Sequence, residues 1–163
     1  MLVYHYMSQL SLSLILHNVR SAHNVGAIFR TADAAGVAKI YLTGYTPAPL
    51  DRFKRPVKEI AKTALGAEMT VPWEQVKDIT ELIARFKKEG IVVWALEQSK
   101  EAINYNQIKL IKSTALIVGN EVEGVKEDIL NLCDQIIAIP MKGQKESLNV
   151  SVATGVVVFK LLE

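Results

Sequence analysis

Short apolar runs rich in β-branched residues recur along this chain and alternate with segments of helical period. Continuous apolar runs, as opposed to alternating ones, are typical of parallel strands that are buried on both faces. The runs predicted as strands are residues 10–16, 39–42, 91–96, 115–118 and 136–139. This alternation predicts an α/β fold with a parallel sheet and helices on both of its faces.

Helical spacing is clearest in the segment 76–86. Apolar side chains recur there every three or four positions, and Gly90 follows as a stop signal. The apolar positions are Val76, Ile79, Leu82, Ile83 and Phe86. Residues 24–35, which end before Gly36, and residues 125–133, with two acidic residues in the first turn, are predicted as further helices.

Three other segments need separate interpretation. Residues 44–58 contain three prolines and are expected to form a long loop, and long loops inside compact domains tend to be functional. A short strand is expected at residues 67–71. Residues 148–162 have strand propensity, but their length favours a buried helix, which we expect to be capped near Ser147 or Asn149.

Composition indicates one globular domain that spans residues 1–163. Half of the residues are hydrophobic and only 22% are charged, which excludes a disordered chain. Cys133 is the single cysteine, so no internal disulfide can form, and no Cys and His cluster has zinc spacing. We therefore expect no metal, no membrane segment, no targeting segment and a cytoplasmic location. Met7 is an alternative start, which would leave residues 1–6 as a poorly ordered lead.

The net charge of +2 conceals a local basic excess. Residues 51–62 contain five basic and two acidic residues, a local net charge of +3, so the rest of the chain sums to −1. A local excess of this kind is expected where one face of a protein meets a polyanion such as a nucleic acid.

Polar residues gather at three junctions between apolar runs and turns. They are Asn-Val-Gly-Ala-Ile-Phe-Arg-Thr at 24–31, Gly-Asn-Glu-Val-Glu-Gly at 119–124 and Ser-Leu-Asn-Val-Ser at 147–151. Each junction alone fits an ordinary loop, with Asn24 as a helix cap and Arg30 as a solvated charge. Arg30 nevertheless lies among apolar residues, and an arginine on so apolar a helix is expected to have a buried anionic partner or a ligand.

Together and in this order, the three junctions resemble the motifs of the SpoU family of RNA ribose 2′-O-methyltransferases, in the SPOUT superfamily. The resemblance implies S-adenosylmethionine as the methyl donor and the ribose 2′-hydroxyl of an RNA as the acceptor. It also implies a C-terminal deep trefoil knot and a homodimer whose active sites lie near the subunit interface. The chain shows neither a separate RNA-binding domain nor flanking helical extensions, which many relatives carry.

The resemblance also assigns roles by position. The polar motif residues, taken as catalytic, are Arg30, Asn24, Ser147, Asn149 and Glu121. The positions that would hold the cofactor, largely through backbone groups and apolar side chains, are Leu96, Gly119, Ile139, Met141 and Leu148. Gly119 would permit close approach of the ligand. The basic residues expected to contact RNA phosphates are Arg20, Arg52, Lys54, Arg55, Lys142 and Lys145.

Two roles stay open at this point. Arg30 is either the general base or a charged clamp for phosphate and ribose. Keeping a guanidinium neutral at pH 7 would cost roughly 9 kcal/mol, which favours the clamp. Glu121 either acts on the substrate or is structural, as a buried carboxylate that accepts hydrogen bonds from the third motif. We expect Asn24 to orient Arg30 or the ribose, and Ser147 and Asn149 to hold the nucleotide.

The RNA substrate is expected to be transfer RNA, with ribosomal RNA as the alternative. Two other functions fit the sequence less well. A non-catalytic RNA-binding module of the same fold would have no need of intact Asn24, Arg30, Ser147 and Asn149. A dinucleotide-dependent oxidoreductase would carry Gly-x-Gly-x-x-Gly after its first strand, and this chain has none there.

Overall fold

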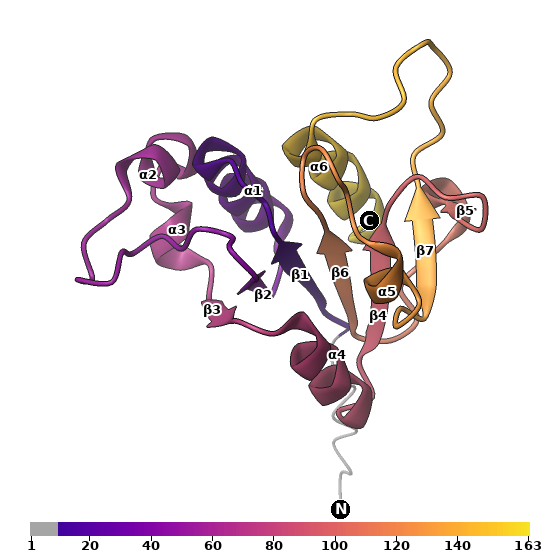
Figure 1. Ribbon diagram of the computed structural model, residues 1–163, viewed down its shortest axis with the longest axis horizontal. Coiled ribbons are helices and arrows are strands. Elements are labelled where there is room, and N and C mark those ends of the chain that lie inside the picture. The colour runs from indigo at the N-terminus through magenta and orange to yellow at the C-terminus, as the bar shows by residue number, and fades with distance from the viewer. Residues whose placement is uncertain (1–9) are drawn as a thin grey trace, which may run out of the picture.

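The computed structural model describes residues 10–163. Seven strands form one sheet in the order β3-β2-β1-β6-β4-β7-β5, and every neighbouring pair is parallel (Figure 1). The strands are β1 (Leu12–His17), β2 (Lys39–Thr43), β3 (Trp73–Val76), β4 (Val92–Leu96), β5 (Ile103–Asn104), β6 (Thr114–Val118) and β7 (Gln135–Ala138). The expected lead at residues 1–6 and the alternative start at Met7 lie outside the described residues.

Helices connect the strands. They are α1 (Ala22–Ala35), α2 (Lys58–Ala64), α3 (Ala67–Thr70), α4 (Ile79–Lys88), α5 (Glu127–Leu130) and α6 (Val150–Leu161), with a short 3-10 turn at Tyr105–Gln107. Parallel neighbours need such crossovers, because the chain must return to the same edge of the sheet before each new strand. The predicted α/β fold with a parallel sheet is confirmed. The knot implied by the resemblance stays a prediction.

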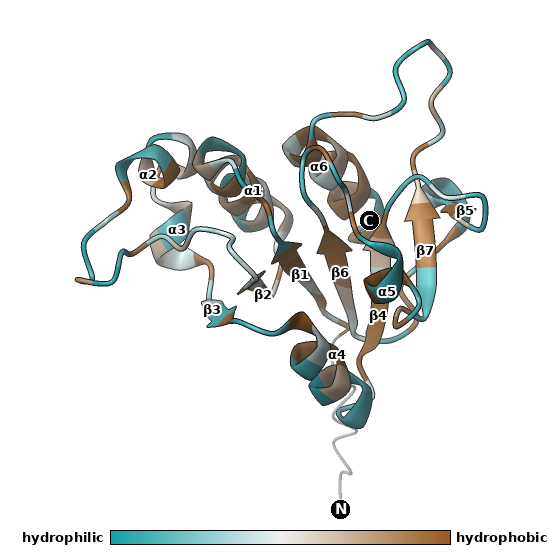
Figure 2. Ribbon diagram, in the orientation of Figure 1, coloured by the Kyte–Doolittle hydropathy of each residue, from teal (hydrophilic) through white to brown (hydrophobic). Residues whose placement is uncertain are grey.

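The core lies in two layers, one on each face of the sheet, as predicted. Helices α1, α2, α3 and α6 cover one face, where Phe29 and Val157 pack on Leu14 and Leu116. Helices α4 and α5 cover the other face, where Phe86 packs with alternate strand residues. Figure 2 shows why the central strands had continuous apolar sequences: they are hydrophobic along their length and lie between the helices.

One predicted segment was assigned wrongly, and one predicted helix begins later than expected. The segment 67–71 is helix α3 (Ala67–Thr70) followed by Val71 instead of a strand, and the strand begins later, at Trp73. The Thr70 hydroxyl donates to Asp33 of α1 at 2.7 Å, so a contact distant in sequence favours the helical turn. Val76 is the last residue of β3, and α4 begins after Asp78, whose side chain accepts the Thr80 N–H.

The other helices follow the sequence more closely. Helix α1 is capped by Ser21, not Asn24, and ends at Gly36, which has a φ of 82°. Helix α6 is capped by Asn149, one of the two expected positions. The helix predicted at 125–133 is only one turn, because Val125 lies in the turn after β6 and Asn131 already ends the helix.

Helices α1 and α2 pack unusually closely, and Gly26 permits this. A Cβ at Gly26 would overlap the carbonyl oxygen of Ile60 and the hydroxyl of Thr63. The same Thr63 hydroxyl donates to the carbonyl oxygen of His23 at 2.9 Å, which joins the two helices directly. The long loop before α2 is therefore attached to the helix that carries the first motif.

Gly26→Ala should lower the free energy of unfolding by about 1–3 kcal/mol, since the added methyl forces α1 and α2 apart. Denaturant unfolding of the two proteins measures this difference. Gly155→Ala is the matched control, because a Cβ there would meet Thr31 Cγ2 at an ordinary 3.7 Å. Equal effects of the two substitutions on stability would contradict the role of Gly26 in the close packing of α1 and α2.

Candidate active site

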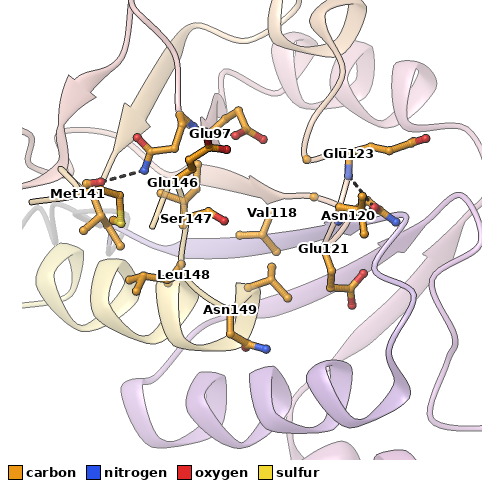
Figure 3. Close-up of a pocket in the computed structure, with 18 residues that line it drawn as sticks. Glu97, Val118, Asn120, Glu121, Glu123, Met141, Glu146, Ser147, Leu148 and Asn149 are labelled. Carbon is orange, nitrogen blue, oxygen red and sulfur yellow. Dashed lines mark hydrogen bonds between the residues drawn. The ribbon is translucent and has the colours of Figure 1, made fainter. Parts of the chain in front are cut away.

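A pocket of about 500 Å³ lies beyond the carboxyl ends of β6, β4 and β7, which are adjacent in the sheet (Figure 3). Ligands of open α/β sheets bind at this edge, where the loops after the strands converge. The lining is formed by residues 96–98, 118–124 and 146–150 with Ile139, Met141 and Ala153. The second and third motifs thus form facing walls, and the end of β4 forms the base.

The structure brings most of the predicted site residues together. All five predicted cofactor positions line the pocket, and so do three of the predicted catalytic residues. They are Leu96, Gly119, Ile139, Met141 and Leu148, with Glu121, Ser147 and Asn149. Asn24 and Arg30 do not line it.

Asn24 is nevertheless joined to the pocket by hydrogen bonds. Its Nδ2 donates to Glu121 Oε1 at 3.1 Å, and its Oδ1 accepts Asn149 Nδ2 at 3.2 Å. In Figure 3 both Glu121 and Asn149 point toward helix α1. One side chain from each motif therefore belongs to a single hydrogen-bonded chain.

The donor and acceptor types fix the direction of these two hydrogen bonds. A carboxylate only accepts, so the Asn24 amide must turn its NH₂ group toward Glu121 and its oxygen toward Asn149. Asn149 Oδ1 is already occupied by the N–H and the hydroxyl of Ser151, at 2.9 and 2.6 Å, as the cap of α6. Its NH₂ group is thus left to face Asn24, and the alternative amide orientations are unfavourable.

Glu121 also holds the start of helix α1. Its Oε2 accepts the Arg20 N–H at 3.0 Å and its Oε1 accepts the Ser21 N–H at 2.9 Å. Partial burial opposes ionisation, but the hydrogen bonds from Arg20, Ser21 and Asn24 outweigh it and lower the pKa of Glu121. The side chain is largely exposed and its partners are Arg20, Ser21 and Asn24 at the start of α1, so the expected buried carboxylate bonded to the third motif is wrong.

Glu121→Gln should cost on the order of 1 kcal/mol of stability at about pH 7, since an amide cannot accept all three bonds. Because the folded pKa is lowered, this stability is present above the ordinary carboxyl pKa and is lost as the pH falls through the folded pKa. The difference from wild type should therefore shrink in urea unfolding as the pH falls below the ordinary carboxyl pKa. Glu123→Gln is the control, since Glu123 only pairs with Lys126 at 3.7 Å on the surface. A stability difference between wild type and Glu121→Gln that does not change with pH would contradict stabilisation by the ionised Glu121 carboxylate.

Gly119 also leaves room for the chain's own backbone, beside its place in the pocket lining. A Cβ there would lie 2.6 Å from the carbonyl carbon of Gly124 and 2.7 Å from the Val125 nitrogen. The close approach is thus made by the chain's own turn. Glu97 closes this turn, since its Oε2 accepts the Val125 N–H at 2.8 Å.

Asn120 was missed by the sequence analysis, and it organises the turn after β6. Its Oδ1 accepts the N–H groups of Val122 and Glu123 at 2.8 and 2.9 Å, and its Nδ2 donates to Asn18 O and Tyr45 Oη. An asparagine directly after a strand and before a glycine-ended turn is a typical signal for this arrangement. Gln98 was also missed; it donates to the carbonyl oxygen of Ile139 at 2.9 Å and joins the β4 and β7 walls.

Arg30 is exposed, contrary to the expected buried partner. The buried residues of α1 are Val25, Gly26, Ile28, Phe29 and Ala32, and Arg30 lies on the opposite side of the helix. No ion pair or hydrogen bond to its side chain is present among residues 10–163. In the single chain Arg30 is therefore a solvated charge, which was the alternative interpretation.

The predicted RNA contacts are all exposed but lie in separate places. Arg20 adjoins Glu121, Lys142 and Lys145 lie in the loop between β7 and α6, and Arg52, Lys54 and Arg55 lie before α2. Their contact with RNA stays a prediction.

Two absences concern the described part of the chain. Residues 10–163 contain no group of His, Cys, Asp or Glu side chains arranged to hold a metal ion. Within the same residues no helix is long and apolar enough to cross a membrane.

Burial raises the pKa of Cys133 to about 11, so its thiol is protonated at neutral pH and acts as a packing group.

A family model described as the SpoU rRNA Methylase family matches residues 11–159, nearly the whole chain. The chain belongs to this family. It is 37% identical over 152 residues to a tRNA (guanosine(18)-2′-O)-methyltransferase of Aquifex aeolicus, covering 93% of this chain and 69% of that protein. It is equally 37% identical over 150 residues to the 23S rRNA (guanosine-2′-O-)-methyltransferase RlmB of Vibrio vulnificus, covering 91% of this chain.

A solved structure shares the fold. The AdoMet-bound rRNA methyltransferase of Sinorhizobium meliloti superposes with a TM-score of 0.79 at 30% identity, over 92% of this chain and 55% of that one. The chain also spans only 58% of the Vibrio protein, so these relatives carry further sequence outside the shared domain.

Proposed function

We propose that this SpoU-family domain is an RNA methyltransferase that transfers the methyl group of S-adenosylmethionine to a ribose 2′-hydroxyl. The observation that carries the proposal is the convergence of Glu121, Asn24 and Asn149, one from each motif, beside a pocket large enough for a nucleotide-sized ligand. The activities of the Aquifex and Vibrio relatives support the same reaction.

The pocket fits S-adenosylmethionine in chemistry. Leu96, Ile139 and Met141 supply an apolar wall for an adenine ring, and backbone groups of the turn after β6 lie opposite. Four carboxylates at the lining favour a cationic ligand. They belong to Glu97, Glu121, Glu123 and Glu146. When bound, this cofactor supplies an electrophilic methyl group on a sulfonium centre.

The protein's contribution is then mainly positioning. Alignment of the reacting groups is worth roughly 7–11 kcal/mol of the barrier, and it requires that the RNA ribose be held rigidly. A permanently charged Arg30 can hold a phosphate beside that ribose, as the clamp that was favoured over a base. Ser147 points into the pocket, toward the side of Val118, in Figure 3, and in this proposal it holds the nucleotide.

Arg30 is supplied to the pocket by a second copy of the chain in this proposal. It is exposed and lies outside its own pocket. Helix α6, which packs beside α1, presents an apolar stripe to solvent at turn-by-turn spacing. The stripe consists of Leu148, Val152, Val156 and Phe159. A symmetric dimer through this stripe would bury it and place Arg30 of the partner subunit near the pocket.

Transfer RNA is the favoured substrate and ribosomal RNA is the alternative. Each is supported by a relative, and the two relatives are equally identical to this chain. The exposed basic residues of this domain can contact the phosphates of a compact RNA. A cytoplasmic site of action is part of the proposal.

Incubation of the protein with cofactor and unmodified transfer RNA should produce 2′-O-methylated nucleosides, detected by mass spectrometry. Arg30→Ala should lower kcat/KM by roughly a hundredfold or more, since it removes the phosphate clamp, whereas Arg30→Lys should keep part of the activity. Ribosomal RNA fragments tested in parallel distinguish the two substrates. A methylated base would contradict the reaction, and recovery of Arg30→Ala at high pH would contradict the clamp.

Mixing two inactive variants tests whether the site is shared. Arg30→Ala keeps an intact pocket, and Ser147→Trp fills the pocket while keeping Arg30. In mixed dimers one of the two sites combines both intact parts, so about a quarter of wild-type activity should return. Val152→Glu, introduced into both variants to charge the α6 stripe, should abolish the recovery and give monomers by light scattering. Restored activity without a dimer, or no recovery with one, would contradict the shared site.

A further inference from the structure

The loop at residues 50–56, before α2, is a compact hairpin. It lies at the outer side of the molecule, between β2 and α2 in Figure 1. Leu50 and Pro56 pair as an antiparallel bridge, and the Asp51 N–H donates to Arg55 O at 2.9 Å. The Lys54 N–H donates back to Asp51 O at 2.9 Å, and Lys54 itself takes a φ of 61° at the tip. The hairpin therefore has a defined shape.

The Asp51 carboxylate holds the tip from inside. Its Oδ1 accepts the N–H groups of Phe53 and Arg55 at 2.8 and 3.0 Å, and its Oδ2 accepts Arg55 Nε at 2.9 Å. The backbone N–H of Arg55 is the largest cause that lowers the pKa of Asp51, so the group is charged at neutral pH. The only acidic residue at the tip is thus used internally.

Phe53 is presented to solvent by this hairpin, with 62% of its surface exposed. The guanidinium carbons of Arg52 and Arg55 lie 4.7 and 4.9 Å from the centre of its ring. Arg55 is fixed by its ion pair with Asp51 at 2.8 Å, whereas Arg52 forms no ion pair with the residues that the structure describes. Arg52 is therefore free to leave the ring for another partner.

We propose that Phe53 stacks on an unpaired base of the RNA substrate, with Arg52 and Arg55 contacting the phosphates beside that base. The proposal rests on the proposed function for the identity of the ligand as RNA. Stacking of a base on an aromatic ring is stronger than an exposed cation–π contact, so a base displaces Arg52 from the ring and the freed guanidinium gains a phosphate. Bases in a duplex already stack on each other, which selects an unpaired nucleotide.

The hairpin is connected to the candidate active site at both ends. Tyr45, near the start of the loop, accepts a hydrogen bond from Asn120 Nδ2 of the pocket turn at 2.9 Å. Helix α2, directly after the loop, packs on α1 through Gly26. A base held by Phe53 would therefore lie at a constant position relative to the site, which gives the contact a role in choosing the nucleotide that reaches it.

The test measures binding of RNA in the absence of methyl donor, by fluorescence anisotropy. The probes are a labelled single-stranded oligoadenylate and a blunt-ended RNA duplex. Phe53→Ala should weaken binding of the single strand by roughly tenfold or more and leave duplex binding unchanged, whereas Phe53→Trp should stay within about twofold of wild type. Phe53→Leu separates stacking from simple hydrophobic contact, and it should resemble Phe53→Ala.

Salt dependence separates the arginines from the ring. Arg52→Ala should reduce the slope of log affinity against log salt by about one, since one phosphate contact is lost, and Phe53→Ala should leave the slope unchanged. Met69→Ala is the matched control, because Met69 is 77% exposed on helix α3, outside the hairpin, and it should change nothing.

Equal binding by wild type and Phe53→Ala, or full binding by Phe53→Leu, would overturn the stacking role, even if ribose methylation were confirmed. Loss of single-strand binding in Phe53→Ala without any ribose methylation by wild type would support the stacking role and overturn the proposed reaction. Loss of binding to single strand and duplex alike would show a damaged loop and overturn the selection of unpaired bases.

Discussion

The site depends on one amide, Asn24, which joins segments 97 and 125 positions away in the chain. Glu121 accepts a hydrogen bond from the NH₂ group of Asn24, and Asn149 donates one to the Asn24 oxygen. The start of α1, the turn after β6 and the start of α6 therefore hold one another in place. Glu121 and Asn149 also act at helix N-termini, which attract acceptor groups. Loss of this amide would uncouple two walls of the pocket from the helix that carries Arg30.

The parallel sheet places these segments within reach of each other. Strands β6, β4 and β7 are neighbours, so the loops after them leave the same edge side by side. The turn after β6 is then shaped by its own groups: Asn120 closes it, Glu97 receives its last N–H, and Gly119 leaves room for the returning backbone. Much of the pocket is therefore built by backbone geometry, and the functional side chains project from a rigid frame.

Helix α1 connects the pocket to the surfaces outside it. One side packs on the sheet, Gly26 brings α2 close, and α6 lies beside it with an unpartnered apolar stripe. Arg30 projects away from the sheet on the same helix. In the proposed dimer the exposed arginine, the stripe on α6 and the Phe53 hairpin would all serve the approach of RNA, while the pocket itself serves the cofactor.

Local periodicity and motif identity are enough to predict the parallel α/β fold, the helix after the third motif and the set of residues around the pocket. The remaining features depend on contacts that exist only in the folded chain. Thr70 and Asp33 meet only in the folded chain, and their hydrogen bond favours the helical turn Ala67–Thr70. Arg30 is exposed because a helix turns sequence neighbours to opposite sides. The partners of Gly119 and Glu121 likewise come from distant segments, and local sequence carries no signal of such contacts.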